Sequence, residues 1–109
     1  MAVKEFQEYR HFRNKKKYDF ICITLPKEDA PIGVLMTTQK VFHTETETWI
    51  TMYNWNRISF TDLDEYLVIY QSEDDDNAEH LYARPVDMFF EHVKSGSGFV
   101  KRFEPLKKA

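Results

Sequence analysis

The chain contains few of the residues that cross-link a small protein or interrupt its secondary structure. Its 109 residues include one cysteine, three glycines and four prolines. A single thiol, Cys22, excludes an intramolecular disulfide and a metal cluster built from several cysteines, and it suits a reducing cytoplasm. Few glycines and prolines, together with 42% apolar residues, argue against a disordered chain. The length predicts a single domain, 1–109, with one core.

Long apolar runs are also missing. No segment reaches the ~18 uninterrupted apolar residues of a membrane-spanning helix. Residues 1–18 carry charges throughout and lack the apolar stretch of a secretion signal. We therefore expect a cytoplasmic protein that does not bind a membrane.

Aromatic residues are in excess, with nine Phe, six Tyr and two Trp. Such side chains favour the pleated, half-buried surface of a sheet. Runs of aromatic and β-branched residues predict short strands at 18–25, 34–42, 48–53, 66–71, 80–83 and 99–103. The composition and the strand pattern together indicate a mainly β protein, a small barrel or roll.

Three segments depart from the strand pattern. Aromatic residues spaced by three predict a helical or turn-like segment over 4–12. Over 59–65, hydroxyl residues ahead of acidic ones leave a short helical turn and an extended loop both open. Pro85 can begin a helix, and the apolar spacing after it predicts one short helix over 86–93, near the C-terminus.

Charge is distributed unevenly, although the net charge is only -3. Residues 1–18 balance to +4, residues 80–109 to +3, and residues 62–79 to -8. The segment 72–79 holds five carboxylates that repel one another, so we expect an acidic, solvated hairpin loop there. A basic face formed by the two ends of the chain would permit an anionic partner without requiring one.

Five short strings occur in an order that resembles the domain of unknown function 1653 family of bacteria and phages. They are Tyr9-Arg10-His11-Phe12, His43-Thr44-Glu45-Thr46, the apolar run ending at Tyr70, Arg84-Pro85 followed by Met88-Phe89, and Arg102-Phe103. The resemblance implies an SH3-like barrel. It supplies no activity, no cofactor and no catalytic residues.

The sequence departs from the compact pattern of that family between Thr46 and Leu67. About twenty extra residues, 47–66, stand where typical members pass almost directly into the apolar strand. A segment rich in Trp, Tyr and Asn can form an inserted hairpin or loop that covers or extends a binding face. A function inferred from compact members therefore does not transfer automatically.

Two groups of polar residues could carry chemistry. In a strand, His43 and Glu45 would share one face and present a donor and an acceptor, whereas the alternative is a structural histidine at a strand end. Arg84 has a planar five-donor group that could hold a carboxylate or phosphate. The competing interpretation of Arg84 is an ion pair with Glu45, Asp87 or Glu91.

The basic N-terminal segment interleaves cations with aromatic rings, a mixture that can bind phosphates and stack on bases but is also typical of a solvated turn. Combined with the strand patterns, it predicts a groove for an anionic small molecule or a nucleic acid. The expected ligand-binding residues are Tyr9, Arg10, His11, His43, Glu45, Tyr70 and Arg84. We predict no bound metal and no cofactor, because neither the histidine spacing nor a glycine-rich loop supports one.

The sequence leaves three classes of function open. The leading one is a binding module that is not an enzyme, since no nucleophile motif is present. A second is an adaptor or phage-encoded inhibitor that contacts another protein through Trp49, Tyr53 and Trp55, because aromatic residues often anchor interfaces. A small hydrolase that uses His43 and Glu45 is the third.

Overall fold

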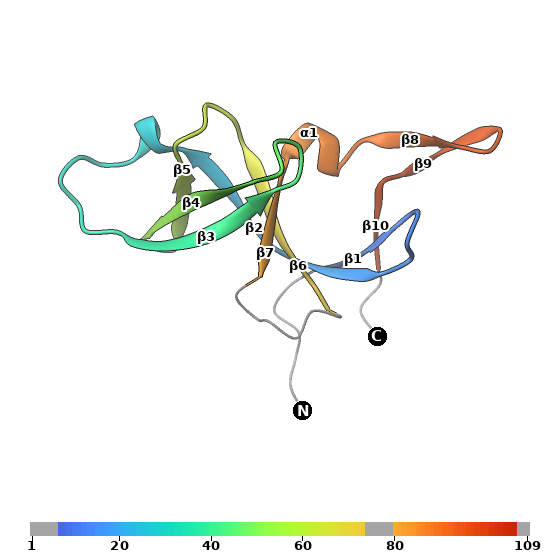
Figure 1. Cartoon of the computed structure of the whole chain (residues 1–109), viewed down its shortest axis with the longest axis horizontal. Coiled ribbons are helices and arrows are strands. Elements are labelled where there is room, and N and C mark those ends of the chain that lie inside the picture. Colours follow the sequence, from blue (N-terminus) through green and yellow to red (C-terminus); the bar gives the residue numbers. More distant parts are fainter. Residues whose placement is uncertain (1–6, 74–79, 107–109) are drawn as a thin grey trace.

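The computed structural model describes residues 7–73 and 80–106 as ten strands, one 3₁₀ turn and one short helix (Figure 1). The acidic loop predicted at 72–79 lies mostly outside the described residues. The elements are β1 (Glu8–His11), β2 (Lys17–Pro26), η1 (Lys27–Asp29), β3 (Thr37–His43), β4 (Thr48–Trp55), β5 (Ile58–Thr61), β6 (Leu67–Ser72), β7 (Leu81–Pro85), α1 (Val86–Phe89), β8 (His92–Ser95), β9 (Gly98–Lys101) and β10 (Phe103–Pro105).

Six strands close into a barrel. Their order is β2-β5-β4-β3-β7-β6, and β6 pairs back onto β2. β2 can close the ring because it is long and its register with β6 shifts between Phe20 and Cys22, which bends the strand. The far edge of β2 also carries β1, and β1 carries β10. The predicted mainly β barrel with a short helix near the C-terminus is confirmed.

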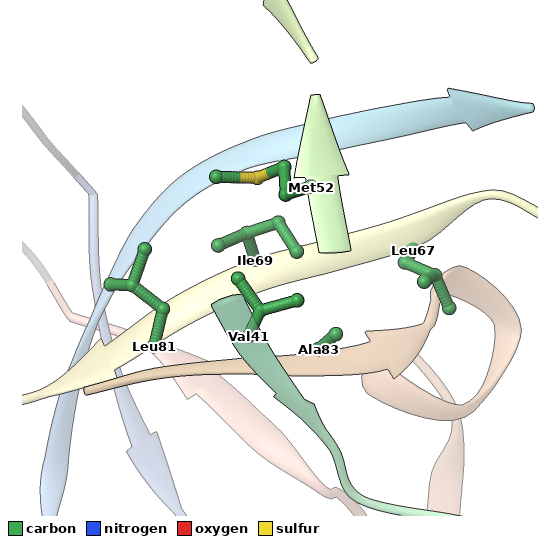
Figure 2. Close-up of a cluster of buried hydrophobic side chains, with 6 residues drawn as sticks. All are labelled: Val41, Met52, Leu67, Ile69, Leu81 and Ala83. Carbon is green, nitrogen blue, oxygen red and sulfur yellow. The ribbon is translucent and has the colours of Figure 1, made fainter. Parts of the chain in front are cut away.

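Small and medium apolar side chains fill the barrel interior. Figure 2 shows the buried cluster of Val41, Met52, Leu67, Ile69, Leu81 and Ala83. Leu81 is 6% exposed, and the other five side chains are 3% exposed or less. These residues come from β3, β4, β6 and β7, because alternate side chains of each strand point inward.

A second, aromatic core lies outside the barrel against β6. Val68 and Tyr70 point away from the barrel interior and pack with Phe89 and Phe103. The Phe89 and Phe103 rings stack in parallel with centroids 4.2 Å apart. β6 is therefore buried on both faces, which explains why its sequence is a continuous apolar run.

Helix α1 supplies one side chain of this aromatic core. It begins directly after Pro85 and ends at Phe89, which is fully buried. The prediction of a helix reaching 93 is wrong at its C-terminal end, because His92–Ser95 pairs with Gly98–Lys101 as a hairpin instead.

Two other segments lack the helical structure that the sequence allowed. Residues 8–11 form a strand and not a helical segment, because β1 is paired on both sides, with β2 and β10. Residues 58–61 form β5 and not a helical turn, because β5 pairs with β4 through the tight turn Asn56-Arg57, in which both residues have positive φ. The hairpin expected within 47–66 is thus β4–β5, and it contributes two of the six barrel strands.

No helix in the described part of the chain is long and apolar enough to span a membrane.

Candidate functional site

A small hollow lies between the aromatic core and the turn that joins β1 to β2. It has a volume of about 190 Å³ and is lined mainly by His11, Asn14, Tyr18, Tyr70, Tyr82 and Arg84, with Thr44 and Phe103 completing its wall. Three of the seven residues expected from the sequence, His11, Tyr70 and Arg84, therefore meet at one place.

The strand registers explain this meeting. Tyr70 of β6 lies opposite Tyr82 of β7, and Arg84 follows Tyr82 on the same face. This face points away from the barrel interior, since the intervening Ala83 is buried in the barrel core. His11 ends β1, whose strand direction brings it to the same hollow.

Among the described residues that line the hollow, Arg84 carries the only permanent charge. Its Nε–H donates a hydrogen bond of 3.3 Å to Tyr70 Oη, and its guanidinium carbon lies 5.5 Å from the centre of the Phe103 ring. No carboxylate of the described residues lies within ion-pair distance of Arg84, and Glu91 pairs with Arg102 instead. The ion pair of Arg84 with Glu45, Asp87 or Glu91 that the sequence left open does not form.

His11 is a neutral ring at physiological pH. Burial, and after it the nearby cations Arg84, Arg102 and Arg13, together lower the pKa of His11 to about 4. Its Nδ1 accepts a hydrogen bond from the Arg13 backbone N–H at 3.2 Å, so the ring proton lies on Nε2. His11 can therefore donate one hydrogen bond to a ligand.

The tyrosines give the hollow its aromatic wall. The Tyr70 and Tyr82 rings stack with centroids 5.6 Å apart, and Tyr18 meets Tyr70 edge-on at 5.5 Å. Burial raises the pKa of Tyr70, although Arg84 partly opposes this shift, so the phenol remains protonated and neutral. At neutral pH the hollow therefore combines one cation, several hydrogen-bond donors and exposed ring edges, a set of groups that suits an anion attached to a planar ring.

Acidification is expected to destabilise the fold through His11. Its folded-state pKa of about 4 lies below the ordinary value of 6.5, so between these pH values the unfolded chain binds a proton that the folded chain does not. The free energy of unfolding should therefore fall as the pH decreases from 6.5 to about 4. Because His11 is partly exposed, we expect about 1 kcal/mol, well short of the full linkage value.

Urea unfolding at pH 7 and near pH 4.5, for the natural chain and for His11→Gln, measures this contribution. The carboxylates titrate in both proteins, so the difference between them isolates His11. An equal loss of stability in the two proteins would contradict the assignment.

His43 and Glu45 do not form a site with Arg84. His43 is 2% exposed; its Nε2 contacts Glu65 Oε1 at 2.9 Å, and its Nδ1 accepts the Thr46 backbone N–H at 3.2 Å. β3 ends at His43, so Glu45 lies in the exposed turn and not on a shared strand face. The predicted pairing of His43 with Glu45 on one face is therefore wrong, and the structure favours the alternative of a structural histidine.

Replacing His43 with leucine is expected to lower the free energy of unfolding by about 1–3 kcal/mol, because the Thr46 N–H and the Glu65 carboxylate both lose a partner. The binding properties of the hollow around Arg84, which His43 does not line, should be unchanged in the folded variant. Chemical denaturation and a binding titration check the two parts. A variant of natural stability that no longer binds would show that His43 contacts the ligand after all.

The remaining predicted residues have other surroundings. Tyr9 packs edge-on against Phe89 at 5.2 Å and belongs to the aromatic core, where burial raises its pKa. Arg10 is exposed, on the face of β1 opposite to Tyr9 and His11. Neither lines the hollow.

Five of the lining residues were not among those predicted as ligand-binding, namely Asn14, Tyr18, Thr44, Tyr82 and Phe103. Tyr82 stands two residues before Arg84, a spacing that places both on one strand face, so this signal was present in the sequence. The contribution of Asn14 depends on the shape of the β1–β2 turn, in which its Oδ1 accepts the Lys16 backbone N–H at 2.8 Å.

The aromatic residues considered as protein-binding anchors differ in exposure. Trp49 is 54% exposed and packs edge-on against Phe42. Tyr53 and Trp55 are half-buried, and Tyr53 donates a hydrogen bond to Asp62 Oδ2 at 3.1 Å. Of these three residues, Trp49 alone is exposed.

Comparison with known proteins supports the family resemblance and adds no function. No curated protein and no solved structure matches the chain. The family described as "Protein of unknown function (DUF1653)" matches residues 57–105. This range runs from the β4–β5 turn to β10 and includes Tyr70, Tyr82 and Arg84, whereas the strings around His11 and His43 lie before it. The match therefore supports the resemblance to the DUF1653 family over residues 57–105 of this chain.

Proposed function

We propose that this protein is a binding module, not an enzyme, and that the hollow around Arg84 takes a nucleotide-like anionic ligand. The observation that carries the proposal is a half-buried guanidinium held by Tyr70 and Phe103, with no carboxylate partner in the described part of the chain. An arginine in such surroundings usually pairs with an anion, because a desolvated charge without one is costly.

The size of the hollow limits how the ligand would be held. At about 190 Å³ it is smaller than the ~300–1,000 Å³ of sites that enclose a drug-sized molecule. It fits a phosphate beside Arg84 while a planar ring rests on the edge formed by Tyr82 and Tyr18. Most of the ligand would remain exposed, which suits micromolar affinity and a module that holds part of a larger molecule.

The chemistry of the lining supports binding over catalysis. Within residues 7–73 and 80–106, those that line the hollow include no carboxylate, no cysteine and no serine. His11, with a pKa of about 4, would be a weak general base at neutral pH. His43 is engaged by Glu65 and Thr46, which weakens the case for a small hydrolase built on His43 and Glu45.

Calorimetric titration with nucleoside monophosphates, the matching nucleosides and inorganic phosphate tests the proposal. We expect monophosphates to bind most tightly, because only they engage Arg84 and the tyrosines together. Phosphate alone should bind weakly and nucleosides hardly at all. Equal affinity for a nucleoside and its monophosphate, or no binding of any of them, would rule out this function.

One observation favours a second candidate function, an adaptor that contacts a protein. Trp49 is a large apolar side chain left on the surface of β4, where an interface anchor would be expected. The half-burial of Tyr53 and Trp55 reduces the area such an interface could use. Trp49→Ala should leave nucleotide affinity unchanged and would weaken only binding to a protein partner.

A further inference from the structure

A second feature outside the hollow is a hairpin arm made of β8 and β9. These two strands form a sheet of their own and pair only with each other in the described part of the chain. Figure 1 shows the arm extending away from the barrel, on the side where the β1–β2 turn also lies. Gly96 has positive φ at the first central position of its tight turn, as a type II′ hairpin requires.

The arm is anchored at its base and exposed along its length. The Arg102 backbone N–H donates to the Glu91 carbonyl at 3.0 Å, and their side chains form an ion pair. The Phe12 backbone N–H donates to the Arg102 carbonyl at 3.0 Å, which ties the base of the arm to the β1–β2 turn. These hydrogen bonds and the ion pair therefore fix the base of the arm to the rest of the fold.

One face of the arm is basic and carries an exposed ring. Because cross-strand partners share a face, the register His92–Lys101 and Lys94–Phe99 places these four residues together. All four are exposed, and Phe99 is 72% exposed. Residues 92–101 include no acidic side chain. Nothing in the fold requires Phe99 to be on the surface, so it is available for a partner.

The β1–β2 turn carries further cations beside the arm. Arg13, Lys15, Lys16 and Lys17 are all exposed in or beside the turn. A groove of about 340 Å³ runs between turn and arm, where Phe12 and Lys15 face Val100 and Lys101, and Glu104 is the one carboxylate on its wall. The basic region of the turn ends beyond Lys17. There the charge is negative, because the carboxylates of Glu8, Asp19 and Glu73 lie within 4.8 Å of one another.

The groove and the Arg84 hollow adjoin the same turn. His11 and Asn14 line the hollow, while Phe12 and Lys15 line the groove. A polyanion that places one phosphate at Arg84 would thus meet the lysines of the turn and then those of the arm. A second copy of the chain would bring like charges together at this surface, and so it fits less well.

We propose that the β8–β9 arm and the β1–β2 turn bind the backbone of a single-stranded nucleic acid, with Phe99 stacking on a base and one nucleotide seated at Arg84. Lysines that follow a backbone and an exposed ring that stacks on any base are the two elements of such recognition. The seating of a nucleotide at Arg84 rests on the proposed function, whereas the role of the arm does not.

Fluorescence anisotropy with a labelled oligothymidylate of about twelve nucleotides tests the inference. The double variant Lys94→Gln/Lys101→Gln should weaken binding about 10-fold near 0.05 M salt and reduce the slope of log K against log salt by roughly 1.4, since each phosphate contact contributes about 0.7 for a single strand. Phe99→Ala should weaken binding about 5-fold or more. Lys40→Gln, which removes one positive charge from β3 of the barrel, is the control for a charge change elsewhere and should have no effect.

Measuring mononucleotide affinity for the same proteins separates this inference from the proposed function. The arm variants should bind the mononucleotide as the natural chain does. Oligonucleotide binding that depends on the arm but not on Arg84 would support the role of the arm and would overturn the proposed binding of a nucleotide at Arg84. Oligonucleotide binding that ignores the arm variants, an absence of oligonucleotide binding, or equal arm-dependent binding of polyglutamate would each overturn the inference.

Discussion

Replacing Phe89 with alanine is expected to lower the free energy of unfolding by about 3–5 kcal/mol, the largest effect of any single change considered for this protein. Phe89 is fully buried and stacks on Phe103, and its ring also meets Tyr9, Phe20 and Tyr70. The alanine would leave a cavity at the centre of the aromatic core. Since small domains have about 5–15 kcal/mol of stability, this loss is a large fraction of the total.

Chemical denaturation of Phe89→Ala measures this loss, and Phe99→Ala is its matched control. Phe99 is 72% exposed, so its removal should change the free energy of unfolding by about 0.5 kcal/mol or less. Similar losses for the two variants would show that the aromatic core does not hold α1 and β10 to the barrel.

Replacing Arg84 with glutamine should lower nucleoside monophosphate affinity by about 10- to 100-fold. A charge-assisted hydrogen bond is worth about 1.5–3 kcal/mol, and glutamine retains neither the charge nor the planar fork. The monophosphate affinity of Arg84→Lys should lie between those of the natural chain and Arg84→Gln, because lysine keeps the charge but lacks the planar fork of donors. The expected loss of stability is about 1 kcal/mol, from the hydrogen bond to Tyr70 and the contact with Phe103.

Arg10→Gln makes the same change on β1, a strand that does not pair with β7. Arg10 is exposed on the face of β1 turned away from the hollow. The Arg10→Gln variant should therefore bind a monophosphate with the same affinity as the natural chain. Equal losses for Arg10→Gln and Arg84→Gln would show a general electrostatic effect and remove the case for a site at Arg84.

The sequence predicted those elements whose pattern is local. β6 was predicted because burial on both faces leaves an unbroken apolar run from Leu67 to Tyr70. Pro85 predicted the start of helix α1. The sequence did not predict where the helix ends, because the next residues form β8, and β8 pairs with β9 further along the chain. β1 was mistaken for a helical segment, since one of its two partners, β10, lies near the other end of the chain and no local pattern indicates that pairing.

The candidate site was predictable in part for the same reason. His11, Tyr70 and Arg84 were chosen by residue type, and the strand registers then brought them together. The partner of His43 is Glu65, 22 residues away, and no local pattern indicates that pair. The absence of a carboxylate beside Arg84 depends on where Glu91 and Arg102 meet, which only the folded chain determines.

The most direct test of the central claim follows the side-chain Nε–H signal of Arg84 by ¹⁵N NMR while a nucleoside monophosphate is added, with Arg84→Lys identifying the signal. The account predicts that this signal shifts with saturation, together with the backbone signals of Asn14, Tyr70 and Tyr82, while those of His43 and Glu65 stay in place. A shift at His43 and Glu65 without any change at Arg84, or no shift at all, would contradict it.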